Sequence, residues 1–173
     1  MRKRLPKILV TGGAGFIGSA CLRQLVEGGA CPAVVDCLTY AGDLKRLQSC
    51  AGKFKFYRAS ICNQQQIEAI FAKEKPALVL HFAAESHVDR SIKDAAPFIE
   101  TNIKGTQVLL DACRKFKIKK FVFISTDEVY GEIARGKFSE TSPFKPNSPY
   151  AASKAAADLL VQSYVRTYNF PAL

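Results

Sequence analysis

Residues 7–18 read KILVTGGAGFIG, a short apolar run that passes directly into a glycine-rich segment. The run over residues 7–11 predicts a buried β-strand, because strands covered on both faces of a sheet are apolar along their whole length. Residues 16–27 then have the apolar spacing of an α-helix, which Gly28 and Gly29 end. A strand, a glycine-rich turn and a helix therefore follow one another near the start of the chain.

Three glycines of this turn, Gly12, Gly15 and Gly18, have the spacing of a dinucleotide-binding segment. The first allows a tight turn, the second allows the backbone to approach a pyrophosphate, and the third allows helix and strand to pack closely. The pyrophosphate would lie on the free amides at the helix N-terminus. Asp36, at the end of the next predicted strand, can bind both hydroxyls of an adenosine ribose and repels the 2′-phosphate of NADP, so the pattern predicts NAD.

Strands and helices alternate along the rest of the chain. Further strands are expected at residues 33–36, 53–58, 77–82 and 120–125, and further helices at residues 64–74, 97–116 and 149–168. This alternation predicts an α/β fold, a doubly wound parallel sheet (Rossmann-like) with helices on both faces. A sixth strand would begin at residues 171–173. We therefore expect residues 1–173 to form an incomplete NAD-binding domain, truncated before its last strands and without a C-terminal substrate-binding region.

The last predicted helix opens with Ser148 as its N-cap and Pro149 in its first turn. Tyr150 and Lys154 are four residues apart on this helix, so their side chains face the same side. A nearby ammonium group would stabilise tyrosinate and lower the pKa of the tyrosine. Such a tyrosine can take a proton from an alcohol while a hydride leaves the same carbon.

Ser125 and Thr126 lie at the carboxyl end of the fifth predicted strand, where ligands bind in parallel sheets. With the glycines and the tyrosine–lysine pair they complete the arrangement of a short-chain dehydrogenase site. Asp127 and Glu128 follow directly, and adjacent carboxylates at a strand end point in different directions. One protonated and one ionised carboxyl group would suit an elimination, with the acid on the leaving hydroxyl and the base on the neighbouring carbon. Away from such a site, the pair would be solvated loop charges.

Four segments carry a resemblance to a known family: GGAGFIG at residues 12–18, AAESHVDRSI at 83–92, ISTDEVYG at 124–131 and SPYAASK at 148–154. They resemble the dTDP-glucose 4,6-dehydratases, which are extended short-chain dehydrogenases/reductases of the NAD-dependent sugar-nucleotide epimerase and dehydratase group. The Thr-Asp-Glu triplet at residues 126–128 is the most discriminating part, because related epimerases usually lack the acid–base pair. The likeness covers essentially the whole chain, which would be the N-terminal portion of such an enzyme.

The resemblance implies a lyase that converts dTDP-glucose to dTDP-4-keto-6-deoxyglucose on bound NAD, without a metal. Tyr150, assisted by Lys154, would remove the C4 hydroxyl proton during oxidation, while Thr126 hydrogen-bonds the same oxygen. Glu128 would then take the C5 proton, and Asp127 would protonate the leaving C6 hydroxyl. Return of the hydride to C6 would complete the cycle.

The resemblance also assigns residues to the two sides of the site. On the cofactor side it matches Phe16, Ile17, Ser60, Ile61, Ala83, Ala84, Glu85, Asn102 and Ser125, together with Tyr150 and Lys154. On the substrate side it matches Ser86, His87 and Thr126. The family usually has Gly-Asp-Ile where residues 59–61 are Ala-Ser-Ile, so we expect weaker adenine binding with Ser60 in place of aspartate. His81, inside a predicted strand, is expected to belong to the core.

Composition and charge argue against a disordered protein and against a specific nucleic-acid binder. Hydrophobic residues make up 48% of the chain and charged residues 23%, which is ordinary for a globular protein and excludes a disordered one. The net charge is +10, with cations clustered at residues 2–7 and 114–120. We expect solvated surface at both clusters, because no aromatic-interleaved basic motif or zinc-finger spacing supports a specific nucleic-acid site.

The cysteines and the apolar runs indicate the compartment. The six cysteines form no CxxC pair and are expected to be reduced, mostly buried thiols of a cytoplasmic protein; they are Cys21, Cys31, Cys37, Cys50, Cys62 and Cys113. The apolar run after the basic start is too short for a signal peptide. No stretch approaches the ~20 apolar residues of a membrane span.

Three other interpretations of the sequence stay open. The first is another NAD-dependent sugar-nucleotide enzyme, such as an epimerase or a UDP-glucuronate decarboxylase, which Asp127 and residues 85–90 disfavour. The second is a non-catalytic NAD-binding module, and the third is a nucleic-acid binder supported by charge alone.

The resemblance also implies a homodimer, formed through the helices at residues 97–116 and 149–168. Both helices offer apolar residues for such an interface, including Val108, Leu109, Leu160, Val161 and Tyr164.

Overall fold

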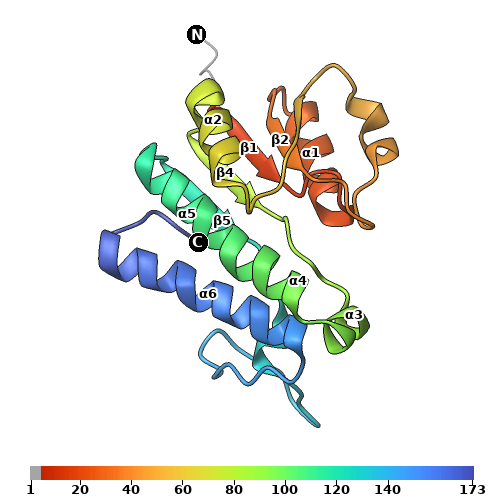
Figure 1. Cartoon of the computed structure of the whole chain (residues 1–173), viewed down its shortest axis with the longest axis vertical. Coiled ribbons are helices and arrows are strands. Elements are labelled where there is room, and N and C mark those ends of the chain that lie inside the picture. The colour runs from red at the N-terminus through yellow and green to blue at the C-terminus, as the bar shows by residue number, and fades with distance from the viewer. Residues whose placement is uncertain (1–4) are drawn as a thin grey trace.

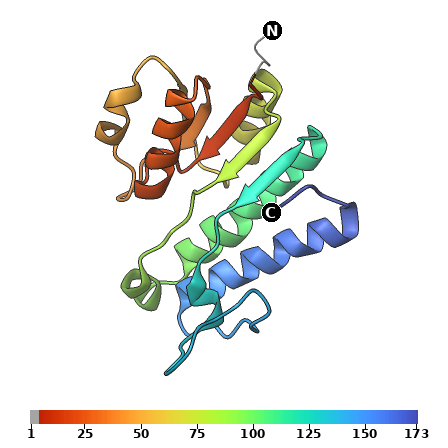
Figure 2. The ribbon, with the colours of Figure 1, turned by 180° about the vertical axis from the view of Figure 1, so that it is seen from behind.

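The computed structural model describes residues 5–173, so most of the basic cluster at residues 2–7 lies outside the described residues. Within them a five-stranded sheet has the order β3-β2-β1-β4-β5, and every neighbouring pair is parallel (Figures 1 and 2). The strands are β1 Ile8–Thr11, β2 Ala33–Asp36, β3 Lys55–Arg58, β4 Leu78–His81 and β5 Lys120–Phe123. This order, which runs outward from β1 in both directions, confirms the doubly wound fold.

The predicted helices are present, and the structure adds several short ones. Three predicted helices correspond to single elements, namely α1 Phe16–Glu27, α2 Gln64–Glu74 and α6 Pro149–Tyr168. The helix predicted at residues 97–116 corresponds to three consecutive elements, namely α4 Ala96–Phe98, η2 Ile99–Gly105 and α5 Thr106–Lys115. The added ones are η1 Leu44–Cys50, α3 Val88–Lys93 and η3 Asp127–Tyr130. The run over residues 96–115 is not uniform, because η2 is a π-helix. A π-helical turn inside an α-helix often marks a functional position.

Two apolar clusters fill the space on the two faces of the sheet. The larger joins Leu9 and Val35 to residues of α2, α5 and α6, including the fully buried Phe71. The smaller joins Val34 to Leu22 of α1 and Leu47 of η1. Neighbouring residues of β2 thus point to opposite faces, as strand geometry requires. Helices cover both faces, and the carboxyl ends of the strands are left free to form a site.

The apolar residues named for a dimer interface are part of the core, and that assignment is wrong. Val108, Leu109, Val161 and Tyr164 are buried in the larger cluster, and Leu160 packs against it. They hold α5 and α6 to the sheet within one chain. Other apolar side chains in this region face outward, among them Ile99 of η2 and Leu159 of α6, both 55% exposed.

The end of the chain lies beside β5. The amide of Phe121 donates to the carbonyl oxygen of Pro171 at 2.9 Å, and the amide of Leu173 donates to the carbonyl oxygen of Phe121 at 2.9 Å. Phe121 and Ala172 form a parallel bridge. Residues 171–173 therefore pair in parallel with β5 at the edge of the sheet.

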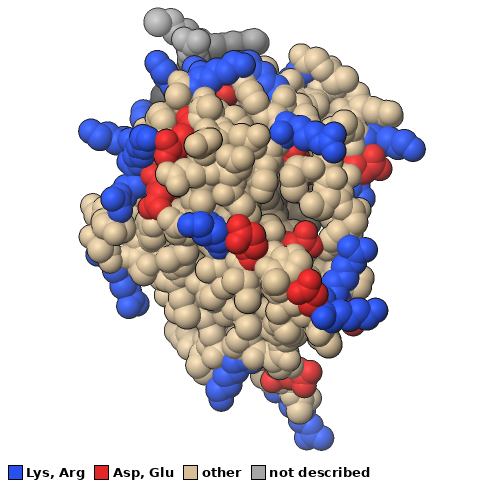
Figure 3. Space-filling view, viewed as in Figure 1, with Lys and Arg blue, Asp and Glu red and all other residues tan. Residues whose placement is uncertain are grey.

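The basic cluster at residues 114–120 is partly neutralised. Lys115 forms an ion pair with Glu68 at 2.6 Å, and the guanidinium of Arg114 lies 4.1 Å from the ring centre of Tyr168. On the face shown in Figure 3, many basic side chains lie toward the margin, and acidic side chains lie among them and across the middle of the face. The charges on this face therefore do not gather into a single basic patch.

The cysteine prediction is wrong in one respect. Cys50 and Cys113 are buried, but Cys31 and Cys37 are exposed, so the thiols are not mostly buried. All six are free in the described chain. Across residues 5–173, no helix has the length and apolar character needed to cross a membrane, and no cluster of three or more His, Cys, Asp or Glu side chains could hold a metal ion.

Candidate functional site

The glycine-rich turn connects β1 to α1 in a form that only glycine permits. Gly12 has φ +69°, and a Cβ atom there would lie 2.5 Å from the backbone nitrogen of Ala83. A Cβ atom on Gly18 would overlap the carbonyl oxygen of Gly12. The turn therefore lies directly against the strand end of β4, and α1 begins directly against the turn. This is the close approach that the glycine spacing predicts.

Asp36, at the end of β2, fixes the turn through its carboxylate. Oδ2 accepts a hydrogen bond from the amide of Ala14 at 2.9 Å, and Oδ1 accepts one from the amide of Leu38 at 2.8 Å. Leu38 itself has φ +58°, an uncommon value for a residue other than glycine. Only 9% of Asp36 is exposed. Its carboxylate thus holds the glycine-rich turn and the loop after β2 together at the carboxyl end of β2.

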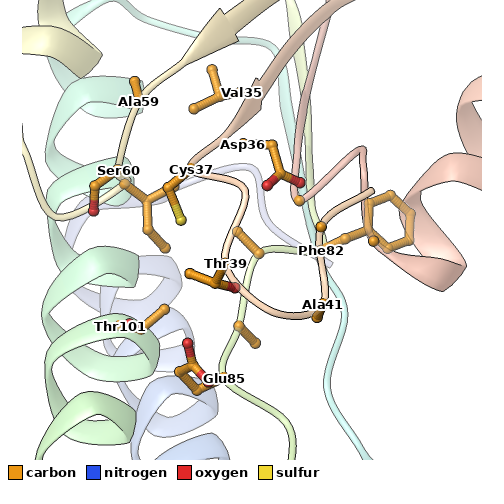
Figure 4. Close-up of a pocket in the computed structure, with 16 residues that line it drawn as sticks. Val35, Asp36, Cys37, Thr39, Ala41, Ala59, Ser60, Phe82, Glu85 and Thr101 are labelled. Atoms are coloured by element: carbon orange, nitrogen blue, oxygen red, sulfur yellow. The ribbon is translucent and has the colours of Figure 1, made fainter. Parts of the chain in front are cut away.

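A cavity opens beside Asp36, between the carboxyl ends of β2, β3 and β4 (Figure 4). Asp36, Ser60 and Glu85 lie around it, and the hydroxyl of Ser60 also accepts a hydrogen bond from the amide of Cys62 at 3.2 Å. Cys37 and Thr101 line it as well, although no motif points to either residue. The predicted residues that line this cavity are Gly12, Gly15, Asp36, Ser60, Ile61, Ala83, Ala84 and Glu85.

A second cavity continues from the first toward α6. The two share wall residues, namely Gly12, Gly15, Ala41, Phe82 and Ala84. The second adds Phe16, Ile17, Gly18, Arg46, Ser86, Ile124, Ser125, Tyr150 and Lys154. Together they form one groove from Asp36 to Tyr150, across the N-terminus of α1. Residues far apart in sequence therefore line one elongated site, as a dinucleotide requires.

Tyr150 and Lys154 both lie in this groove, but not as the sequence suggests. The ammonium group of Lys154 donates a hydrogen bond to the carbonyl oxygen of Ile124 at 2.6 Å and lies 4.2 Å from the ring centre of Phe123. Burial lowers the pKa of Lys154 to about 8. Burial also raises the pKa of Tyr150, with Glu128 and Asp127 acting in the same direction and the Thr126 hydroxyl against it. The expected lowering of the tyrosine pKa by the lysine is thus wrong for this arrangement.

Thr126, Asp127 and Glu128 lie close to Tyr150, at the start of η3. The strand ends at Phe123, so the two carboxylates belong to a helical turn and not to a strand end. Thr126 caps this turn, its hydroxyl accepting a hydrogen bond from the amide of Glu128 at 3.3 Å. Successive residues of a 3₁₀ turn point about 120° apart. The carboxylates therefore still point in different directions, with Asp127 exposed and Glu128 half-buried.

Asn102 supports the site from behind. Its side-chain oxygen accepts a hydrogen bond from the amide of Glu85 at 2.8 Å, and its amide group donates to the carbonyl oxygen of Glu85 at 2.9 Å and to the hydroxyl of Ser153 at 2.8 Å. Asn102 lies in η2 and is 1% exposed, so it does not reach the groove wall. It fastens the loop after β4 to α6, the helix that carries Tyr150 and Lys154.

The two histidines differ in their surroundings. His81 is buried, with Nδ1 2.7 Å from the hydroxyl of Thr11 and Nε2 3.1 Å from the hydroxyl of Thr106. Burial lowers the pKa of His81 to about 3. His81 is thus a core residue, as predicted. His87 is exposed at the N-terminus of α3, next to the groove residue Ser86.

The atoms that line the groove fit a dinucleotide. The hydroxyl of Ser125 is buried and has no hydrogen-bond partner among the described residues, although it lies in the groove wall beside Tyr150. Such an atom is costly unless a ligand supplies the partner. At the other end the Asp36 carboxylate faces the cavity (Figure 4), and Gly15, which has no side chain, lines both cavities.

Comparison with known proteins agrees with this geometry. Residues 9–173 match the family model described as GDP-mannose 4,6 dehydratase. The chain belongs to this family. It is 46% identical over 181 residues to the dTDP-glucose 4,6-dehydratase of Neisseria meningitidis serogroup B, covering 96% of this chain and 51% of that protein. It is 48% identical to the enzyme of the same name from Shigella flexneri, covering 96% of this chain and 52% of that protein.

Solved structures of similar proteins have the same fold. The dTDP-glucose 4,6-dehydratase DesIV of Streptomyces venezuelae, determined with NAD bound, superposes with a TM-score of 0.91 at 44% identity, covering 96% of this chain and 53% of that one. The UDP-glucose 4-epimerase of Thermus thermophilus, also with NAD, gives 0.89 at 37% identity, covering 96% and 53%. The chain thus spans about half the length of the relatives it matches. The resemblance inferred from the four segments is confirmed.

Proposed function

We propose that this chain binds NAD and forms the cofactor half of a dTDP-glucose 4,6-dehydratase. The main support for the proposal is the groove that extends from Asp36 to Tyr150 across the glycine-rich turn. Asp36 would bind the adenosine ribose, the N-terminus of α1 the diphosphate, and Ser125 the nicotinamide end. NAD supplies a hydride acceptor and, at the end of the cycle, a hydride donor.

Tyr150 is positioned to handle the proton of the first oxidation. It shares the groove wall with Lys154 and lies close to Thr126, which would hydrogen-bond the C4 oxygen of the sugar. Because burial raises the pKa of this phenol, additional positive charge is needed before it can act as a base. The ammonium of Lys154 can supply it by leaving the carbonyl oxygen of Ile124, and the oxidised nicotinamide ring is itself cationic.

Asp127 and Glu128 would supply the acid and the base for the elimination of water. Once C4 is a ketone, the C5 proton is acidic, and Glu128 would take it. Asp127 would protonate the C6 hydroxyl, which leaves as water. Their separate directions on η3 allow the two groups to reach neighbouring carbons of one sugar.

The neighbouring epimerases provide the alternative activity. Their structures superpose almost as well as that of the dehydratase, so the fold does not separate the two reactions. The acid–base pair close to Tyr150 favours dehydration, because epimerisation at C4 needs proton and hydride transfer at C4 but no elimination.

Product analysis tests the proposal. The protein, carrying a C-terminal half such as its relatives have, would be incubated with NAD and dTDP-glucose and the product identified by mass and NMR. We expect dTDP-4-keto-6-deoxyglucose, which is lighter than the substrate by one water. A product of unchanged mass with inverted C4 would contradict the dehydratase assignment and favour the epimerase.

We also propose a cytoplasmic homodimer through η2 and α6. Ile99 and Leu159 leave apolar side chains exposed on these helices, where a second copy would cover them. Sedimentation of the wild type and of Leu159→Glu would test this. A wild type that is monomeric at all concentrations and well folded would contradict the dimer.

A further inference from the structure

Arg46 lies in η1, outside every motif of the sequence, yet its guanidinium reaches the glycine-rich turn. Its Nη1 donates hydrogen bonds to the carbonyl oxygens of Ala14 at 3.1 Å and Ala41 at 2.7 Å. The amide of Asp43 also donates to the carbonyl oxygen of Ala14, at 3.0 Å. The amide of Ala14 is in turn held by Asp36 at 2.9 Å, so both the amide and the carbonyl group of Ala14 are fixed. Arg46 thus fastens the loop after β2 to the turn.

Arg46 also brings a positive charge to the groove. It lines the section that contains Gly15, Phe16 and Gly18, and it is half-buried. Within residues 5–173 its side chain forms no ion pair, and both hydrogen bonds that the side chain donates end on neutral carbonyl oxygens. Guanidinium has five N–H donors in a planar fork suited to phosphate oxygens. A half-buried cation without a carboxylate partner, beside a helix N-terminus, fits an anionic ligand.

On the basis of the proposed function, we propose that Arg46 is a diphosphate-binding residue of the NAD site. Its Nη1 positions the turn, and its remaining N–H groups donate to the diphosphate. The positive charge adds to that of the α1 N-terminus, where the amides alone would otherwise face two negative charges.

Ligand fragments separate this role from general support of the site. The 173-residue chain would be titrated calorimetrically with NAD, ADP and adenosine, as wild type, Arg46→Gln, Arg46→Lys and Lys45→Gln. Lys45 is an exposed neighbour in η1 that does not line the groove, so its variant removes the same charge as a matched control. Arg46→Gln should weaken NAD and ADP binding roughly tenfold to a hundredfold. Adenosine, which lacks phosphate, should bind as before.

Two further readouts would not respond to a merely structural role. The decrease of NAD affinity with rising salt should be shallower in Arg46→Gln than in wild type. Arg46→Lys, which keeps the charge but not the fork, should keep the wild-type salt dependence and lose less ADP affinity than the glutamine variant. If circular dichroism shows that Arg46→Gln does not fold, the test rests on Arg46→Lys. This variant should bind ADP more weakly than wild type and adenosine with unchanged affinity.

Equal affinity of Arg46→Gln and wild type for NAD and ADP would overturn the proposal. Equal loss of NAD, ADP and adenosine would overturn it too, because it would mark damage to the whole site. If the wild type binds adenosine and ADP equally well, no phosphate contact exists and the proposal also fails. A wild type that binds none of the three ligands would instead refute the proposed function, and the Arg46 proposal with it.

Discussion

Replacement of Asp36 by asparagine tests how the groove selects its cofactor. A 2′-phosphate in place of the ribose hydroxyl would lie against a carboxylate that is 9% exposed. Two unit charges about 4 Å apart repel by roughly 4 kcal/mol at the effective dielectric constant of a protein surface. That energy is on the order of a thousandfold in affinity, since about 1.4 kcal/mol corresponds to tenfold. Wild type should therefore prefer NAD to NADP by about three orders of magnitude.

Asp36→Asn removes this repulsion and should bring the two affinities to within about tenfold. It also places an amide group opposite one of the two backbone amides that now donate to the carboxylate, those of Ala14 and Leu38. Loss of one such hydrogen bond should lower the free energy of unfolding by about 1–3 kcal/mol. Asp43→Asn is a matched control, because Asp43 is exposed, caps η1 and does not line the groove.

Calorimetric titration with NAD and NADP measures the preference, and urea unfolding measures the stability. Equal affinity of the wild type for both cofactors would refute the electrostatic reasoning. So would an Asp36→Asn protein that keeps the full preference for NAD.

Three further predictions concern stability and the frame of the site. Gly12→Ala should lower the free energy of unfolding by about 1–3 kcal/mol and abolish NAD binding, because φ is +69° and the new Cβ atom would overlap the backbone of Ala83. Thermal unfolding measures the first effect, and calorimetric titration with NAD measures the second. Asn102→Ala should lower the free energy of unfolding in urea by about 1–3 kcal/mol, because the Glu85 amide loses its hydrogen-bond partner. Asn102→Asp should not restore the stability, because its second carboxylate oxygen would face the Glu85 carbonyl oxygen. The pKa of His81 is about 3 in the folded protein against an ordinary 6.5, so between these values only the unfolded state binds the proton. The free energy of unfolding should therefore fall by up to about 1.4 kcal/mol per pH unit as the pH decreases from 6.5 to 5, and the same fall in a His81→Gln protein would contradict this.

The parts of the molecule that depend on local sequence could be predicted. Helix α6 has the predicted bounds, because Ser148 caps its first turn and Asn169 takes the left-handed conformation that ends it. The glycine-rich turn could be predicted for the same reason, since a tight strand-to-helix connection restricts which residues can occupy it.

The remaining features depend on contacts between distant residues. The π-helical turn η2 accompanies the hydrogen bonds of Asn102 to Glu85 and Ser153, which lie 17 and 51 positions away along the chain. The contact of Lys154 with the carbonyl oxygen of Ile124 likewise spans 30 positions. Arg46 enters the groove only because η1 folds back onto α1. Spacing within a segment carries no information about such contacts.

NADH absorbance in a single turnover measures the roles proposed for Tyr150 and Asp127 separately. In the protein carrying a C-terminal half, Asp127→Asn with dTDP-glucose should still oxidise C4 and then lose water ~10²–10⁴-fold more slowly, so that NADH accumulates on the enzyme. Tyr150→Phe should form no NADH. Absence of NADH in Asp127→Asn, together with normal formation in Tyr150→Phe, would contradict the account.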